Sequence, residues 1–155
     1  MATLKIDRKA GDNVYLHKDF HGGLSAGLEY VRLRYGEQAV RDYLRQFALA
    51  WYAPLTKALR EKGLPALREH YDHIFKLEGG EVHFTESPDE LLIEVLLNPA
   101  VAHMKANGYA ISPLFNETVA TVGKTICEST PYAMEMLRYE AETGRYTQRF
   151  FRRAA

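Results

Sequence analysis

Apolar residues recur at helical spacing through the first half of the chain, and glycine and proline residues interrupt them. Leu24, Leu28 and Val31 lie on one face of a predicted helix that ends or bends at Gly36. Pro54 should break the next helix, because proline lacks the N–H that the helix needs. The pattern predicts helical segments over residues 24–35, 37–53, 55–62 and 64–78.

The pattern changes after Gly79 and Gly80 to short segments that are typical of β-strands. EVHFTE and LLIEVLL flank Ser-Pro-Asp-Glu and predict a β-hairpin over residues 81–97. AMEMLRYEA and RYTQRFFRR predict a second hairpin that turns around Gly144. Consecutive hairpins of this kind indicate an antiparallel sheet.

Two short helices are expected between the hairpins. Asn98 followed by Pro99 is a favourable start for the first helix, and Ser112 followed by Pro113 resembles a second start. The second helix carries a row of small or polar residues, which is Asn116, Ala120, Gly123 and Cys127. This row allows either tight packing of helices around an inert thiol or the close approach of a ligand.

The whole pattern predicts one α+β domain. We expect N-terminal helices plus an antiparallel sheet of about four strands in two hairpins, with two short helices between the hairpins. Residues 1–13 form a polar N-terminal arm, and residues 14–155 form the domain.

The charge and composition narrow the class of partner. Lysine plus arginine equals aspartate plus glutamate, 20 against 20, so no net field attracts a nucleic acid or an anionic membrane. The single cysteine excludes an internal disulfide and favours a reducing compartment. The first residues contain no apolar signal region, and no apolar run approaches the roughly 20 residues that a membrane-spanning helix needs. We therefore expect a soluble, cytoplasmic protein with a small-molecule partner.

His17 and His21 are the first candidates for chemistry. They lie four residues apart with Asp19 between them, so on a helix both imidazoles would project from one face. They could share a metal ion with His103 and Glu117, or one could act as a base while the other orients it. The alternative is that these residues only cap the start of a helix.

The second helix between the hairpins holds the remaining candidates. Glu117 could be a general base beside the amide of Asn116 and the hydroxyl of Thr118, or it could only favour the positive end of the helix dipole. Cys127 would need a basic neighbour such as Lys124 to become a nucleophile, and otherwise it is a buried, inert thiol. Phosphate-binding loops, dinucleotide fingerprints and serine-nucleophile motifs are absent from the sequence. The sequence predicts no particular cofactor.

Four stretches of the chain resemble the L-2-amino-thiazoline-4-carboxylic acid hydrolase-like family. They are YLHKDFHGGLSAGLEYVRLRYGEQAVRDYLRQFA, PAVAHM, ETVATVGKTIC and TGRYTQRFF, and the similarity extends from Val14 to Phe151. The resemblance implies hydrolysis of a cyclic amidine: water adds to the C=N carbon and the ring opens. The resemblance falls on His17, Asp19, His21, His103, Glu117, Thr118 and Cys127. We expect catalytic roles for His21, His103 and Glu117. We expect His17, Asn116, Thr118 and Cys127 to contact the substrate.

The chain departs from the family at two positions, since Asn116 and Tyr146 stand where relatives have cysteine. Two hypotheses follow. The first is a small-molecule hydrolase that acts on a C–N or amidine-like bond of a thiazoline-like, amino-acid-derived substrate. The second is a non-catalytic small-molecule-binding or sensor domain, with or without a bound metal. Aromatic residues on the last strand could also form a homodimer interface.

Overall fold

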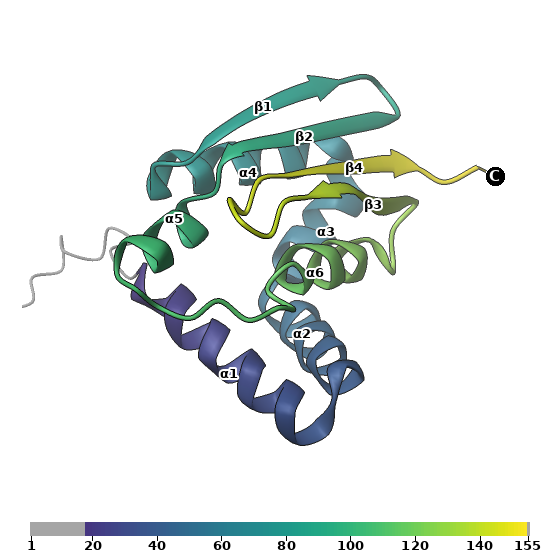
Figure 1. The fold of residues 1–155 in the computed structure, drawn as a ribbon. Helices are drawn as coiled ribbons and strands as arrows, with labels where there is room; N and C mark the ends of the chain where they lie inside the picture. The colour runs from purple at the N-terminus through teal and green to yellow at the C-terminus, as the bar shows by residue number, and fades with distance from the viewer. Residues whose placement is uncertain (1–17, 155) are drawn as a thin grey trace, which may run out of the picture.

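The computed structural model describes residues 18–154, and the predicted arm at residues 1–13 lies outside them. Within this part of the chain, six helices and a four-stranded antiparallel sheet form an α+β fold, as predicted (Figure 1). Four helices precede the first hairpin, and two lie between the hairpins.

The four N-terminal helices follow the predicted punctuation. They are α1 (Asp19–Tyr35), α2 (Glu37–Trp51), α3 (Ala53–Lys62) and α4 (Leu64–Glu78). Gly36, Gly63 and Gly79 separate helices or end them with φ of 89°, 73° and 74°, which favours glycine over residues that carry a Cβ. Pro54 lies in the first turn of α3, where its missing N–H leaves no hydrogen bond unmade.

The sheet joins the two hairpins through their inner strands. Its strands are β1 (Glu81–Glu86), β2 (Glu90–Leu97), β3 (Tyr132–Tyr139) and β4 (Tyr146–Arg152), in the order β1-β2-β4-β3. β2 and β4 pair antiparallel, with Ile93 opposite Gln148 and Leu91 opposite Phe150. The centre of the sheet is therefore built from strands that are far apart in the sequence.

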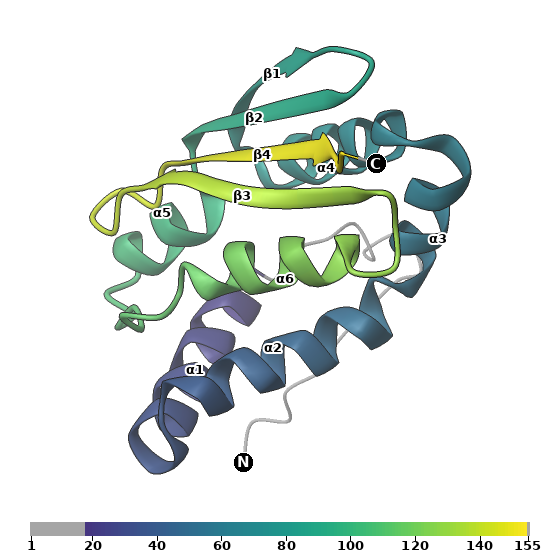
Figure 2. The ribbon, with the colours of Figure 1, turned by 90° about the vertical axis from the view of Figure 1, so that its right-hand side faces the viewer.

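The helices lie on one side of the sheet (Figure 2). α4 and α6 (Glu117–Cys127) contact the strands directly, while α2 packs against α6, and α1 packs against α2 and α5 (Pro99–Ala106). The inner face of the sheet carries buried residues such as Ile93 and Phe150. The opposite face is polar, since Arg149 pairs there with Glu90 and Glu135. The core therefore lies between the sheet and the helices.

The last two helices begin differently. Asn98 caps α5 as predicted, because its side-chain oxygen accepts hydrogen bonds from the N–H groups of Ala100 and Val101. The predicted start of the next helix at Ser112 is wrong, since residues 113–116 form turns and α6 begins at Glu117. Ser112 does cap a turn, by accepting a hydrogen bond from the N–H of Leu114. Among residues 18–154, no helix has the length and apolar character needed to cross a membrane.

Candidate functional site

His21 and Glu78 form a buried hydrogen-bonded pair between α1 and the end of α4. Nε2 of His21 lies 3.0 Å from Oε2 of Glu78, and the two side chains are only 15% and 7% exposed. The last turn of a helix disfavours a carboxylate, so the Glu78 carboxylate depends on His21 for compensation. An ionised carboxylate can only accept a hydrogen bond, which places the proton on Nε2 and leaves Nδ1 as the basic nitrogen of His21.

Tyr52, Tyr71 and Tyr146 lie close to one another on the inner side of the fold. The negative charge of Glu78 affects the pKa values of Tyr52 and Tyr146. Burial, and then the negative charge of Glu78, raise the pKa of Tyr52. Burial is also the main reason that the pKa values of Tyr71 and Tyr146 lie well above 10, and Glu78 adds to the rise at Tyr146. The three hydroxyls therefore stay protonated and neutral at physiological pH.

Gln148 adds an unpaired amide to this group. It lies on the inner face of β4, between Tyr146 and Phe150, and it is completely buried. Neither its Nε2 nor its Oε1 has a hydrogen-bond partner. The amide is near enough to the Tyr71 hydroxyl to favour the ionised form of the tyrosine slightly, but without hydrogen-bond geometry. We call Tyr52, Tyr71, Glu78, Tyr146 and Gln148 the inner polar cluster.

A second carboxylate–histidine pair lies at the start of α1. Nε2 of His103, on α5, is 2.9 Å from Oδ1 of Asp19, and the Tyr109 hydroxyl donates to the same oxygen at 3.1 Å. This hydrogen bond raises the pKa of Tyr109. The Asp19 side chain is 74% exposed, so this pair lies in a far wetter place than the His21–Glu78 pair.

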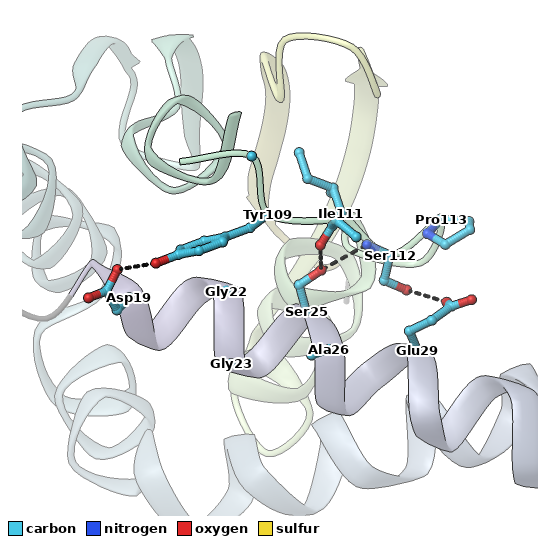
Figure 3. A pocket seen from close by; sticks show the side chains of 12 residues that line it. Asp19, Gly22, Gly23, Ser25, Ala26, Glu29, Tyr109, Ile111, Ser112 and Pro113 are labelled. Carbon is cyan, nitrogen blue, oxygen red and sulfur yellow. Dashed lines mark hydrogen bonds between the residues drawn. The ribbon is translucent and has the colours of Figure 1, made fainter. Parts of the chain in front are cut away.

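A groove of about 800 Å³ lies between α1 and residues 108–113 (Figure 3). Gly22 lets the Tyr109 ring lie against α1, because an added Cβ would come within 2.7 Å of that ring. Ser25 donates to the carbonyl of Ala110 at 3.0 Å and accepts from the N–H of Ser112 at 2.8 Å. These polar groups bind one another, so they fasten the loop to α1.

Glu117 lies in another part of the fold, on the side of α6 that meets α2. Its Oε1 accepts from Nε of Arg41 at 3.0 Å, and its Oε2 accepts from the hydroxyl of Thr121 at 2.6 Å. Among the described residues, no hydrogen bond or ion pair joins Glu117 to His21 or His103. Through Arg41, Glu117 joins α6 to α2.

Asn116 and Thr118 serve the start of α6. The Asn116 carbonyl accepts from the N–H groups of Val119 and Ala120, while its side chain forms no capping hydrogen bond. The Thr118 hydroxyl donates to the carbonyl of Phe115 at 2.6 Å. Both side chains are half-buried.

Cys127 is a buried thiol. Its residue is completely buried, and burial raises its pKa to about 12, against a smaller opposing effect of Arg153. A thiol with this pKa is not a nucleophile at physiological pH. Gly123, in the same row, lets α6 pack closely on β3, since a Cβ there would collide with Met134. The row therefore packs two elements together.

His17 lies outside the described residues. Within residues 18–154, no group of three or more histidine, cysteine, aspartate or glutamate side chains is arranged to hold a metal ion. His70 lies between the rings of Tyr52 and Tyr71, and His83 forms an exposed pair with Glu94 on the sheet.

Glu78 and Gln148 are not among the predicted site residues, although both leave a signal in the sequence. Glu78 continues the inward stripe of α4 after Leu67, Tyr71 and Phe75, at spacings of four, four and three. Gln148 occupies an inward position of an alternating strand. A polar residue at an inward position of an apolar stripe is the signal that would have found both.

Comparison of the sequence with models of known protein families, and with curated proteins, finds no match. The assignment of a function therefore depends on how the side chains are arranged.

Proposed function

We propose that this protein is a small-molecule hydrolase that acts on a C–N or amidine-like bond of a thiazoline-like, amino-acid-derived substrate. The observation that carries the proposal is the buried His21–Glu78 pair, in which a proton on Nε2 makes Nδ1 of His21 the nitrogen that can accept a proton. A carboxylate bound to the other ring nitrogen orients the imidazole and stabilises its protonated form. The resemblance of the sequence to a family of cyclic amidine hydrolases supports the class of substrate.

The proposed reaction adds one water to the substrate. Nδ1 of His21 takes a proton from water while the water oxygen bonds to the C=N carbon, and the electron pair of that double bond moves to nitrogen, which takes this proton from the imidazolium. Nδ1 then takes the proton of the new hydroxyl as the tetrahedral intermediate forms a C=O bond and expels a ring heteroatom, and the imidazolium passes that second proton to the leaving atom. Glu78 remains ionised throughout and positions the imidazole.

His103 is not placed to share this centre. Its partner Asp19 is two residues from His21 on α1, and residues at this spacing project from different sides of a helix. We therefore assign both proton transfers to His21. The His103–Asp19 hydrogen bond joins α5 to the start of α1.

The test measures ring opening of L-2-amino-thiazoline-4-carboxylate. His21→Ala should reduce turnover by about two orders of magnitude or more, because general-base catalysis is typically worth about 10²–10⁴-fold. His83→Ala is the matched control, since His83 also pairs with a carboxylate but is 65% exposed on the sheet. The proposal fails if wild-type protein opens no ring, or if both variants retain wild-type turnover.

Glu78→Gln tests the positioning role of the carboxylate. Glutamine keeps a hydrogen-bond acceptor for Nε2 but removes the charge that favours the protonated imidazole. The acidic limb of the pH profile of kcat should therefore move to lower pH in this variant. A lower kcat with an unmoved profile would show that Glu78 has a structural role only.

A second candidate function is a sensor that binds the same class of molecule without turnover. The unpaired amide of Gln148 favours it, because that group predicts a bound ligand whether or not chemistry follows. Wild-type protein that is stabilised by the thiazoline and returns it unchanged would select the sensor over the hydrolase.

We further propose a cytoplasmic location, since the only cysteine is a buried free thiol that suits a reducing compartment. A homodimer formed through the last strand would depend on Phe151, because Phe150 and Tyr146 are buried on the inner face. The Arg149 guanidinium already lies 4.5 Å from the Phe151 ring centre.

A further inference from the structure

We infer that the inner polar cluster is the binding site for a planar ring that is neutral when bound and presents an N–H group beside a C=O or C=N acceptor, with Gln148 as its recognition residue. Lactams, cyclic ureas and cyclic amidines share this chemistry. The inference rests on the proposed function in one respect, since it makes such a molecule the substrate of the His21–Glu78 pair.

The donor and acceptor chemistry of Gln148 carries the inference. The side chain is completely buried, and both its nitrogen and its oxygen lack a partner. Leaving buried polar atoms unpaired costs free energy, so nearly all such atoms in proteins have a partner. A primary amide presents an N–H donor beside a C=O acceptor. Its complement is a molecule with an acceptor beside an N–H, which would satisfy both atoms at once.

The groups around Gln148 favour a neutral ring next to its amide. Burial raises the pKa values of Tyr71, Tyr146 and Cys127, so these side chains carry no charge at physiological pH. Glu78 carries the nearby negative charge, and His21 already pairs with it. A ring that stayed charged at Gln148 would lose its hydration without gaining a counter-charge there, which is unfavourable in a buried site.

Aromatic rings supply flat walls that suit a planar molecule. The ring centres of Tyr71 and Phe150 are 5.9 Å apart, and those of Tyr139 and Tyr146 are 6.5 Å apart in a stacked arrangement. Ligand sites of this kind combine apolar and aromatic walls with a few convergent polar groups. Tyr52 and Tyr71 are only half-buried, so the cluster is not sealed from solvent.

The cluster is continuous with the proposed reaction centre. Tyr71 lies next to Gln148 and interacts electrostatically with Tyr146, which in turn interacts with Glu78. Glu78 binds His21 directly. A ring held at Gln148 would therefore lie on the helix-covered side of the sheet, as the His21–Glu78 pair does.

The test measures thermal stability with 2-imidazolidinone as the probe and its 1,3-dimethyl derivative as the matched control, since only the parent compound has N–H donors. The parent compound should raise the Tm of the wild-type protein, and the dimethyl derivative should not. Gln148→Met has a similar volume and no polar atoms. It should abolish the shift while its own Tm without probe equals or exceeds that of the wild type. Gln46→Met, at an exposed position of α2, should retain the shift.

Three results would overturn the inference. They are no stabilisation of wild-type protein by the parent compound, an undiminished shift in Gln148→Met, and a Tm of Gln148→Met well below wild type with no probe effect in either protein. The last result would show that the amide holds only buried water. If Gln148→Met does not fold, Tyr71→Phe replaces it, and a reduced shift is again expected.

Ring opening of the thiazoline separates this inference from the proposed function. Probe binding that depends on Gln148, without ring opening, keeps the site and removes the hydrolase. Ring opening that Gln148→Met leaves unchanged keeps the hydrolase and removes the site.

Discussion

At the scale of single residues, surroundings decide what each polar group can do. Cys127 has the residue type of a nucleophile, but it is completely buried and its pKa is about 12. His21 is an ordinary imidazole whose second nitrogen is fixed by Glu78. The base of the proposed reaction is therefore the imidazole, and the thiol is not a nucleophile at physiological pH.

The Cys127 thiol should react slowly with alkylating reagents in the folded protein. At pH 8 a pKa of about 12, in place of 9.0, lowers the thiolate fraction by about a thousandfold. Iodoacetamide labelling, followed by mass spectrometry, should therefore be at least about a thousandfold slower in native protein than in urea. Equal rates in the two conditions would show that the thiol is accessible and activated.

Sequence patterns locate some of the important residues and miss the relations between them. The candidates His21 and His103 each hold a carboxylate, but their partners Glu78 and Asp19 come from pairings that only the tertiary structure defines. Gln148 occupies an inward position of β4, and its lack of hydrogen-bond partners depends on the side chains that neighbouring elements place around it. Local periodicity carries no information about such long-range contacts.

At the scale of elements, the turn of the second hairpin is joined to the start of α5. Gly144 has a φ of 69°, and the Asn98 side chain donates to its carbonyl at 2.9 Å while also capping α5. A Cβ at Gly144 would collide with Val101 and come within 3.1 Å of the Asn98 amide nitrogen. The turn therefore needs glycine both for its backbone conformation and for its packing.

Gly144→Ala should destabilise the protein by roughly 2–5 kcal/mol. The left-handed backbone accounts for about 1–2 kcal/mol and overpacking for about 1–3 kcal/mol. Gly27→Ala is the control, because Gly27 is in the interior of α1 and a Cβ there meets nothing within 4 Å. The control should stabilise by about 0.5–1 kcal/mol through helix propensity. Urea unfolding would measure both, and a Gly144→Ala variant as stable as wild type would contradict this account.

Element types were predictable from the sequence, whereas one helix start was not. In β2 the buried Leu91, Ile93 and Val95 alternate, because one face of the sheet is buried. Ser112 and Pro113 resemble a helix start, but tertiary hydrogen bonds to Ser25 and Glu29 hold Ser112 on α1. The chain then makes turns over residues 113–116 before α6 begins. A cap signal cannot reveal this competing contact.

At the scale of the whole molecule, one half-buried histidine links stability to mild acid. His70 of α4 packs between the rings of Tyr52 and Tyr71, at 5.8 and 5.4 Å between ring centres. Burial, and then the neighbouring His73, lower the pKa of His70. Its neutral form is favoured in the folded state, so the unfolded chain binds the proton more readily.

The free energy of unfolding should therefore fall as the pH drops from about 6.5 towards 5. The contribution of His70 is complete above the unfolded pKa of about 6.5 and is lost as the pH falls through the lower folded value. His70→Phe keeps a ring between the two tyrosines and should flatten part of this fall. Urea unfolding at pH 7, 6 and 5 would measure the effect. His83→Ala, at an exposed site, should keep the wild-type slope, and an unchanged slope in His70→Phe would exclude this source.

The strand order β1-β2-β4-β3 has a consequence for the kinetics of folding. The two strands of each hairpin are close in the sequence and can pair locally. The central strands β2 and β4 can pair only after the chain between Leu97 and Tyr146 has brought them together. Closing a loop of that length before its contacts form is entropically unfavourable and slows folding. Gln148 lies in this pairing, opposite Ile93, so we expect its surroundings to form only when the two halves of the chain come together.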